Sequence, residues 1–222
     1  MYTRAEENYL KCIFHLEQEQ KGAIATNAIA QMMNTKASSA TDMIQRLADK
    51  ELVAYRRYKG TSLTKEGVAV AVAVVRKHRL WEVFLVEKLN FQWDEVHEIA
   101  EQLEHIQSEE LITRLDKFLD HPDYDPHGDP IPDKDGNIKK TEKKVLSDMS
   151  KNQQGILVGV RETSGEFLQY LDKRKIAIGS KIKVLGIEFF DGSMIIQVKE
   201  EQFFISKKIA ENLYIQVLHK NQ

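Results

Sequence analysis

The residues of this chain that could do chemistry are imidazoles and carboxylates crowded into the stretch EVHEIAEQLEHIQSEE, residues 95–110. At about 100° per residue, a helix would bring four of them within roughly a third of its circumference: His97, Glu101, Glu104 and His105. Two more, His78 and Glu82, are four residues apart in RKHRLWEVFL and would share a face of their own helix. Neutral imidazole and carboxylate are ligands of first-row divalent cations. The pattern predicts metal binding, although a lone helical histidine is more often an ordinary surface or core residue.

Other chemistries lack the residues that they need. His97-Glu98 is followed by Glu101 where a zinc-protease motif would need its second histidine. Structural zinc is disfavoured because Cys12 is the single cysteine, and that residue is expected to pack inside an amphipathic helix. No Ser/His/Asp or Cys/His arrangement stands out. We therefore expect a binding protein and not an enzyme.

The charge of the chain is unevenly distributed, although the net charge is only −2. Residues 1–74 carry 10 Lys and Arg against 8 Asp and Glu, and residues 134–222 carry 16 against 11. Residues 75–133, in contrast, carry 6 basic against 15 acidic side chains. This acidic segment could attract cations. A solvated acidic surface is the plainer explanation of the charge alone.

The N-terminal segment and the composition favour the cytoplasm. No apolar run approaches the ~20 residues that span a bilayer, and MYTRAEENYLK lacks the apolar core of a signal peptide. One cysteine excludes an internal disulfide and fits a reducing compartment. We expect a cytoplasmic protein with no membrane partner, long enough at 222 residues for more than one small domain.

The first 74 residues have the pattern of a winged helix-turn-helix. An amphipathic helix is expected over 4–19, a short one over 26–33 capped by Thr26, and a third from Ser38 or Ser39 to about residue 50. Two short helices joined by a tight turn are typical of the helix-turn-helix. The alternating run LVAYRRYKGTSLT then predicts a β-hairpin, or wing, around Lys59-Gly60.

The remaining chain predicts a helical domain and a small β domain. We expect a long helix capped by Thr64, a ligand-bearing helix capped by Asp94 and a further helix opened by Ser108, before a loop that contains all four prolines. A lysine-rich linker is expected over 134–154, and from Gly155 short β-like runs suggest a small barrel. The fold class is thus mainly α with a small C-terminal β domain. The expected domains are 1–74 (DNA binding), 75–133 (helical, metal binding) and 155–222 (barrel).

Candidate DNA contacts lie on the expected recognition helix, its approach and the wing. Hydroxyls can bond base edges or phosphates, a carboxylate can accept from a cytosine amino group, and basic side chains suit phosphates. The candidates are Thr26, Lys36, Ser38, Ser39, Thr41, Asp42, Gln45, Arg46, Arg57 and Lys59. The alternative is that the serines are helix caps and the charges a solvated face.

With these motifs the chain resembles the diphtheria toxin repressor / manganese transport regulator family of metal-dependent transcriptional repressors. The resemblance covers essentially the whole chain. It is carried by AEENYLKCIFHL, RKHRLWEVFL, EVHEIAEQLEHIQSEEL and PHGDPIP, and by IAIGSKIKVL in the last domain. It implies a homodimer of winged helix-turn-helix domains, a helical dimerisation domain and an SH3-like (FeoA-type) barrel.

The resemblance also implies two metal sites. The primary site maps onto Asn8, Glu101, Glu104 and His105. The ancillary site maps onto His78, Glu82, His97 and, from the third domain, Glu166. Iron-type members have cysteine at the position of Glu101 and methionine at that of Asn8, whereas manganese-type members have glutamate and aspartate.

The expected metal follows from these oxygen donors. They suit a hard ion such as Mn²⁺, and Fe²⁺ remains open because geometry and metal availability set selectivity. Manganese-type members without a third domain use a second first-helix carboxylate, and here Lys11 occupies that position. We therefore expect manganese-type donors in the primary site and the iron-type ancillary arrangement.

The expected function is a metal-dependent repressor that binds palindromic operator DNA as a dimer and controls metal-uptake genes. An iron-responsive repressor of iron-uptake genes is the first alternative. Two alternatives of other classes are a metalloenzyme or metal-storage protein that carries a winged helix, and a winged helix used for protein contacts.

Overall fold

The computed structural model describes residues 2–20, 22–139 and 142–218, which form two compact units. Unit 1 comprises Met1–Trp81, Ala100–Arg114 and Pro132–Ile138, and unit 2 comprises Glu82–Ile99, Leu115–Ile131 and Lys139–Gln222. Within the described ranges, no helix combines the length and the apolar character that a bilayer span requires.

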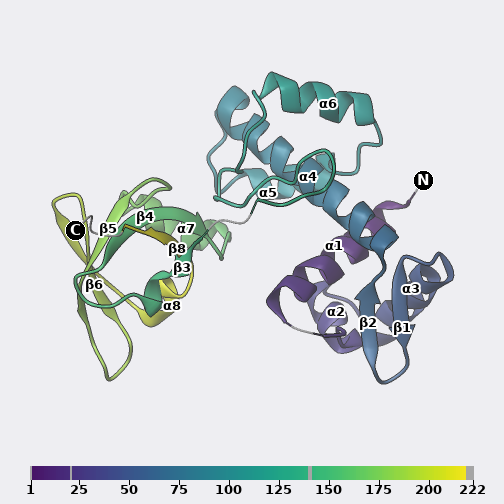
Figure 1. The fold of residues 1–222 in the computed structure, drawn as a ribbon, viewed down its shortest axis with the longest axis horizontal. Helices are drawn as coiled ribbons and strands as arrows, with labels where there is room; N and C mark the ends of the chain where they lie inside the picture. Colours follow the sequence, from purple (N-terminus) through teal and green to yellow (C-terminus); the bar gives the residue numbers. More distant parts are fainter. Residues whose placement is uncertain (1, 21, 140–141, 219–222) are drawn as a thin grey trace. The chain divides into compact units, whose positions relative to one another are not determined.

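Unit 1 begins with the expected winged helix-turn-helix (Figure 1). Its helices are α1 (Arg4–Glu19), α2 (Thr26–Met32) and α3 (Ala37–Asp49), followed by the wing strands β1 (Val53–Arg56) and β2 (Gly60–Leu63). The strands pair antiparallel, with Val53 opposite Leu63 and Arg56 opposite Gly60. Leu10, Ile13, Ile29, Ile44 and Leu47, all 0% exposed, belong to the core that fixes these helices against one another.

Three further helices follow the wing. They are α4 (Lys65–Leu89), α5 (Val96–Leu103) and α6 (Glu109–Phe118), and each contributes residues to both units. The first two carry the expected ligands His78, Glu82, His97 and Glu101, whereas Glu104 and His105 lie in the turn after the second helix. Thr64 Oγ1 accepts the Gly67 N–H at 3.1 Å, and Ser108 Oγ accepts the Leu111 N–H at 3.2 Å. The expected Thr64 cap is therefore confirmed, and Ser108 caps the helix that it was expected to open.

Unit 2 holds the small β domain, an antiparallel sheet in the order β3-β8-β4-β5-β6-β7. Its elements are β3 (Lys144–Val145), η1 (Leu146–Asp148), β4 (Gln154–Val160), α7 (Gly165–Asp172), β5 (Lys181–Ile187), β6 (Met194–Val198), β7 (Glu201–Ile205), α8 (Lys207–Ala210) and β8 (Leu213–Val217). The register shifts between Leu157 and Gly159 and between Val184 and Gly186, and such irregularities bend a strand. The expected class, mainly α with a small β domain, is confirmed.

The proline-rich loop is joined to this β domain within unit 2. The Val160 N–H donates to the His127 carbonyl at 3.0 Å. Gly128 has φ +84°, and a Cβ there would stand 2.0 Å from the Val158 carbonyl oxygen. Glycine is therefore required at this close approach of two backbones. The contact fixes the loop that carries Asp125 and His127.

The structure differs from the expected linker over 134–154. Lys144 and Val145 pair with β8. Leu146 and Met149 are 0% and 2% exposed in the core of the β domain. The linker prediction followed from the lysine-rich composition of the segment. Only the fold shows that these two apolar side chains face inward. Residues 140 and 141 of this segment lie outside the described residues.

Two expected helix starts also differ. Thr26 is the first residue of α2, and Ala25 is its N-cap, without a side-chain cap. The helix expected to start at Asp94 begins at Val96, while Asp94 Oδ2 accepts a hydrogen bond from Gln169 Nε2 at 2.8 Å. Short polar side chains such as Thr26 and Asp94 can cap a helix or hydrogen-bond to another partner. The sequence alone does not distinguish these two uses.

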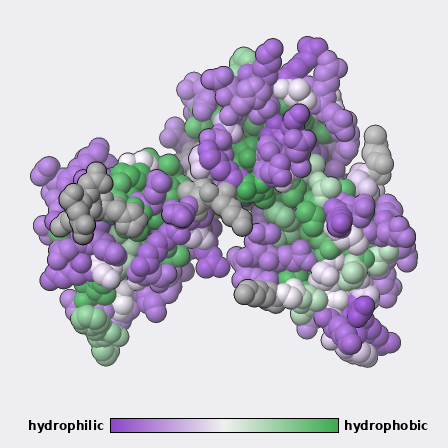
Figure 2. All heavy atoms as spheres, viewed as in Figure 1, coloured by the Kyte–Doolittle hydropathy of each residue, from purple (hydrophilic) through white to green (hydrophobic). Residues whose placement is uncertain are grey.

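The surface is mostly hydrophilic on the face drawn in Figure 2. Among the described residues, Phe189 and Phe190 are the most exposed large apolar side chains, at 97% and 102%. Both follow β5, in the connection to β6.

Candidate metal centre

The first turns of α1 present three polar side chains toward the core of unit 1. Thr3 and Glu6 form a capping box that starts the helix. Glu7, Asn8 and Lys11 follow at spacings that keep them on neighbouring faces. Glu7 is 3% exposed, and the Lys11 side chain is 13% exposed. A buried acid and a nearly buried base both need polar partners in the interior.

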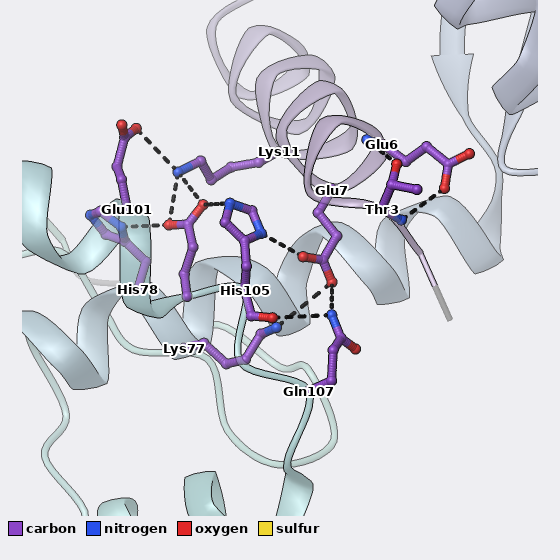
Figure 3. A network of polar contacts seen from close by, with 10 residues as sticks. Thr3, Glu6, Glu7, Lys11, Lys77, His78, Glu101, His105 and Gln107 are labelled. Atoms are coloured by element: carbon purple, nitrogen blue, oxygen red, sulfur yellow. Dashed lines mark hydrogen bonds and ion pairs between the residues drawn. The ribbon is translucent and has the colours of Figure 1, made fainter.

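Those partners come from α5 and the residues after it (Figure 3). Lys11 Nζ lies 2.7 and 2.9 Å from the two oxygens of Glu104 and 3.5 Å from Glu101 Oε1. Glu104 is 0% exposed and also accepts from His78, whose Nδ1 lies 2.6 Å from Glu104 Oε2. Glu104 is therefore the centre of the network.

His105 is held as a metal-ligating histidine usually is. Its Nδ1 lies 2.5 Å from Glu7 Oε2, and Gln107 Nε2 donates to Glu7 Oε1 at 2.8 Å. When a carboxylate accepts a hydrogen bond from one ring nitrogen of a neutral histidine, the other ring nitrogen keeps its lone pair. That nitrogen can then bind a metal ion. That other nitrogen, Nε2, is buried and has no hydrogen-bond partner among the described residues, although Glu104 Oε1 lies 3.5 Å away.

Asn8 supplies a second buried atom that lacks a partner. Its Oδ1 is buried without a hydrogen bond within the part of the chain that the structure describes. A buried oxygen without a donor costs free energy in the folded state. An amide oxygen, an imidazole nitrogen and carboxylate oxygens are together a donor set for Mn²⁺ or Fe²⁺. The residues expected for the primary site therefore fit such an ion.

The electrostatics keep the central carboxylate ionised. Burial alone would raise the pKa of Glu104, but the hydrogen bond from His78 and the charge of Lys11 outweigh it and lower that pKa. The carboxylate thus remains available as an anionic ligand near neutral pH.

A second group of donors lies within unit 2 and was missed by the reading of the sequence. One ligand atom from each of Glu82, Asp125 and His127 lies within 4.8 Å of the others, and all three residues are buried. His127 Nε2 lies 2.8 Å from the Trp93 carbonyl oxygen, which directs Nδ1 to Glu82 Oε2 at 3.4 Å. Asp125 Oδ1 accepts the backbone N–H groups of His127 and Asp129, both at 2.9 Å.

The surroundings of His127 in this structure favour its protonated form. Burial disfavours the charge of His127, but its contact with Glu82 and the charges of Glu82 and Asp125 outweigh burial and raise the pKa of His127. A metal ion at Nδ1 would have to displace that proton.

The residues expected for the ancillary site are distributed over several elements. His97 Nδ1 lies 3.4 Å from Glu82 Oε1. His78 stands one turn before Glu82 on α4, with its Nδ1 on Glu104. Glu166 is exposed in the first turn of α7, whose Gln169 contacts Asp94, three residues before His97. Glu82 is thus shared between the expected donor set and the group with Asp125 and His127.

Cys12 is an unreactive core residue. It is 4% exposed, and burial raises the pKa of its thiol to about 11. The thiol is therefore protonated at neutral pH, as expected for a packed side chain.

The candidate DNA contacts lie mostly on exposed surface of unit 1. Lys36 is the N-cap of α3, and the exposed residues are Lys36, Ser38, Ser39, Asp42, Gln45, Arg46, Arg57 and Lys59. Thr41 is half-buried, and its Oγ1 donates to the Ala37 carbonyl at 2.8 Å. Thr26 is half-buried at the start of α2. Tyr58, 92% exposed at the wing turn, is a neighbour that the sequence reasoning did not single out.

Two signals in the sequence could have found the missed donors. Asp125 and His127 flank Pro126 in the loop, and a carboxylate and an imidazole two residues apart in a proline-fixed loop can converge. Glu7 precedes Asn8 on the same turn as the expected ligand. Neither signal shows burial, which is what gives these residues their role.

Together, the wing, the helices and the buried donors define a winged-helix protein with a metal-binding helical domain. Residues 1–61 match "Iron dependent repressor, N-terminal DNA binding domain", residues 64–133 match "Iron dependent repressor, metal binding and dimerisation domain", and residues 144–217 match "FeoA domain". The chain belongs to the diphtheria toxin repressor / manganese transport regulator family, as the sequence motifs predicted.

Relatives and solved structures agree with this assignment. A manganese-dependent transcriptional repressor in complex with manganese is 31% identical, with 96% of this chain and 100% of that chain covered and a TM-score of 0.88. The structure of the manganese regulator SloR is 34% identical, covering 96% and 98%, with a TM-score of 0.77. The iron-dependent repressor IdeR of Mycobacterium tuberculosis is 36% identical over 57% of this chain and 54% of its own length. The chain thus spans about half the length of many curated relatives that it matches.

Proposed function

We propose that this protein is a metal-dependent transcriptional repressor that binds operator DNA when it holds Mn²⁺, with Fe²⁺ as the alternative metal. The observation that carries this proposal is a pair of buried ligand atoms, Asn8 Oδ1 and His105 Nε2, that make no hydrogen bond within the described residues. His105 Nε2 lies 3.5 Å from Glu104 Oε1. Asn8 lies on the first helix of the winged domain, whereas His105 follows α5. A cation bound there would supply a positive charge that joins the two segments.

The donors would couple metal to DNA through the position of α1. Asn8 on α1, with Glu101, Glu104 and His105, would form the primary site, and Glu7 would orient His105. Because α1 packs in the same core as α3, fixing α1 fixes the recognition helix. In a homodimer, two such helices would meet successive major grooves of a palindromic operator.

An ancillary site is proposed around Glu82. It has two candidate ligand sets. The family resemblance gives His78, His97 and Glu166, of which His97 lies 3.4 Å from Glu82, and the second set is Asp125 and His127, whose ligand atoms also lie close to Glu82. The preference for manganese rests on the oxygen donors at positions 8 and 101 and on manganese in the names of similar structures. The proposed targets are metal-uptake genes, and the proposed location is the cytoplasm, where the DNA target of such a regulator is found.

Operator binding measured with and without metal tests the proposal. We expect a mobility shift with Mn²⁺ that is lost in chelator, and equal shifts in both conditions would contradict the metal switch. E104Q should lower Mn²⁺ affinity at least about tenfold and abolish the metal-dependent shift. E109Q is the matched control, because Glu109 is an exposed glutamate in the first turn of α6. Repeating the titration with anaerobic Fe²⁺ decides between the two metals.

A further inference from the structure

Lys11 is a cation that contacts the expected metal ligands themselves, so its charge opposes metal binding. Its ammonium contacts both oxygens of Glu104, at 2.7 and 2.9 Å, and approaches Glu101 Oε1 at 3.5 Å. These are two of the carboxylates that the proposed site needs. Figure 3 shows the Lys11 side chain reaching from α1 toward Glu101.

The ammonium does for Glu104 what a metal ion would do. A fully buried carboxylate needs a positive partner, because an uncompensated charge in the interior is costly. The Lys11 side chain is 13% exposed, so its interaction with Glu104 is weakly screened by solvent. In the metal-free network, Glu104 therefore already has a positive partner.

A divalent cation and this ammonium cannot share Glu104 at low energy. Two like charges at contact distance repel each other strongly inside a protein, and a divalent ion doubles the repulsion that the ammonium feels. We propose that Lys11 is a tethered cation that occupies Glu104 in the metal-free protein and has to leave it when a divalent ion binds. Lys11 thereby sets the metal concentration at which the protein responds.

A purely structural lysine would behave in the opposite way. If Lys11 only shaped the pocket, its loss would disorder Glu104 and weaken metal binding. If it competes with metal, its loss strengthens metal binding while it destabilises the metal-free protein. The sign of the change in Mn²⁺ affinity therefore separates the two roles.

Lys77 provides a matched control. Its side chain is 12% exposed, close to the 13% of Lys11, and its Nζ lies 3.8 Å from Glu7 Oε1. It belongs to the same network, but it pairs with Glu7, which contacts His105, and not with the expected ligand Glu104. K77M therefore removes a similar charge without vacating the proposed metal position.

The experiment is a Mn²⁺ titration by calorimetry of the full-length wild type, K11M, K11Q, K77M and E104Q, with thermal melts of each metal-free protein. We expect K11M and K11Q to bind Mn²⁺ about tenfold more tightly or better, because one repulsive charge is gone. K77M should change the affinity less than about threefold, because its charge lies farther from Glu104. We expect metal-free K11M to have a lower melting temperature than the metal-free wild type. K11Q, whose amide can still donate to Glu104, covers the case in which K11M does not fold.

The inference rests on the proposed primary site, and E104Q separates the two. If E104Q loses Mn²⁺ binding while K11M or K11Q binds no more tightly than wild type, Lys11 is not a competitor and the site stands. If E104Q binds Mn²⁺ as wild type does, the proposed site fails and the role of Lys11 fails with it.

Discussion

At the scale of single residues, burial gives the donors of this protein their chemistry. Glu104, in the turn after α5, and Glu109, in the first turn of α6, belong to one acidic stretch, but the first is fully buried and the second is exposed. The buried one must find positive partners or metal, while the exposed one is satisfied by water. The same contrast separates the buried His127 from His97, whose side chain is 47% exposed.

This difference in burial predicts which of the two histidines belongs to the ancillary site. Of the two histidines near Glu82, His127 is buried beside a second carboxylate, so we expect H127Q to remove one Mn²⁺ equivalent and H97Q to remove none. Calorimetric stoichiometry of the two variants, with E104Q to mark the primary site, measures this.

The opposite result would restore the donor set expected from the family resemblance. If H97Q loses the equivalent and H127Q keeps it, Glu82 works with His78 and His97, and the Asp125–His127 pair is a structural hydrogen-bonded turn.

At the scale of elements, α1 carries contacts to both the metal-binding residues and the recognition helix. Glu7 pairs with His105, while the neighbouring Glu6 pairs with Lys50, at 2.6 Å, on the C-cap of α3. The first turn of α1 therefore links the residues after α5 to the end of α3. This arrangement gives the Glu6–Lys50 pair a role in holding the recognition helix.

The pair should make stability depend on pH in a defined window. Burial alone would raise the pKa of Glu6, but its hydrogen bonds with Lys50 and Thr3 outweigh this and lower that pKa. Its stabilisation is then present above the ordinary glutamate pKa of about 4.3. It is lost as the pH falls through the lower folded-state pKa. E6Q keeps the capping hydrogen bond, so it should cost up to about 1 kcal/mol at pH 7 and nothing once Glu6 is protonated.

Denaturant melts of wild type and E6Q at pH 7 and at low pH measure this difference. K50M should give a similar loss at pH 7, and the double variant should lose little more than either one. A difference between E6Q and wild type that persists after Glu6 is protonated would show that packing, and not the charge, is responsible.

The wing should contribute affinity without sequence selectivity. Lys59 is exposed next to Gly60, whose φ of +99° turns the hairpin. We expect K59A to weaken binding to operator and unrelated DNA by similar factors and to lower the slope of log affinity against log salt by about 1. Mobility shifts at several salt concentrations test this. A loss confined to the operator would instead assign Lys59 to base contacts.

At the scale of the whole molecule, metal and DNA should act as reciprocal ligands. Any factor by which Mn²⁺ raises operator affinity must equal the factor by which operator raises Mn²⁺ affinity, and such factors are commonly about 5- to 150-fold. We expect Mn²⁺ titrations with saturating operator to give the tighter dissociation constant, with scrambled DNA as the control. Equal constants with operator and without DNA would mean that metal and operator binding are uncoupled.

The elements and the class of chemistry were readable from the sequence because they depend on local patterns. Apolar periodicity placed the first helix at 4–19, where α1 runs Arg4–Glu19, and the Lys59-Gly60 turn placed the wing. The ligand types in EVHEIAEQLEH indicated a metal-binding helix by composition and spacing alone. The residue-level ligand sets remain predictions.

Tertiary structure decided which of these residues are buried and what each contacts. In the sequence, Lys11 stands where some manganese-type members have a carboxylate. In the structure, its ammonium contacts Glu104. Asp125 and His127 are 43 and 45 residues from Glu82 along the chain, and they meet it because the proline-rich loop folds back beside α4. Such contacts depend on long-range packing, which sets local dielectric and partners. The sequence thus determined the donors available to this protein, and the fold determined which donors are buried together.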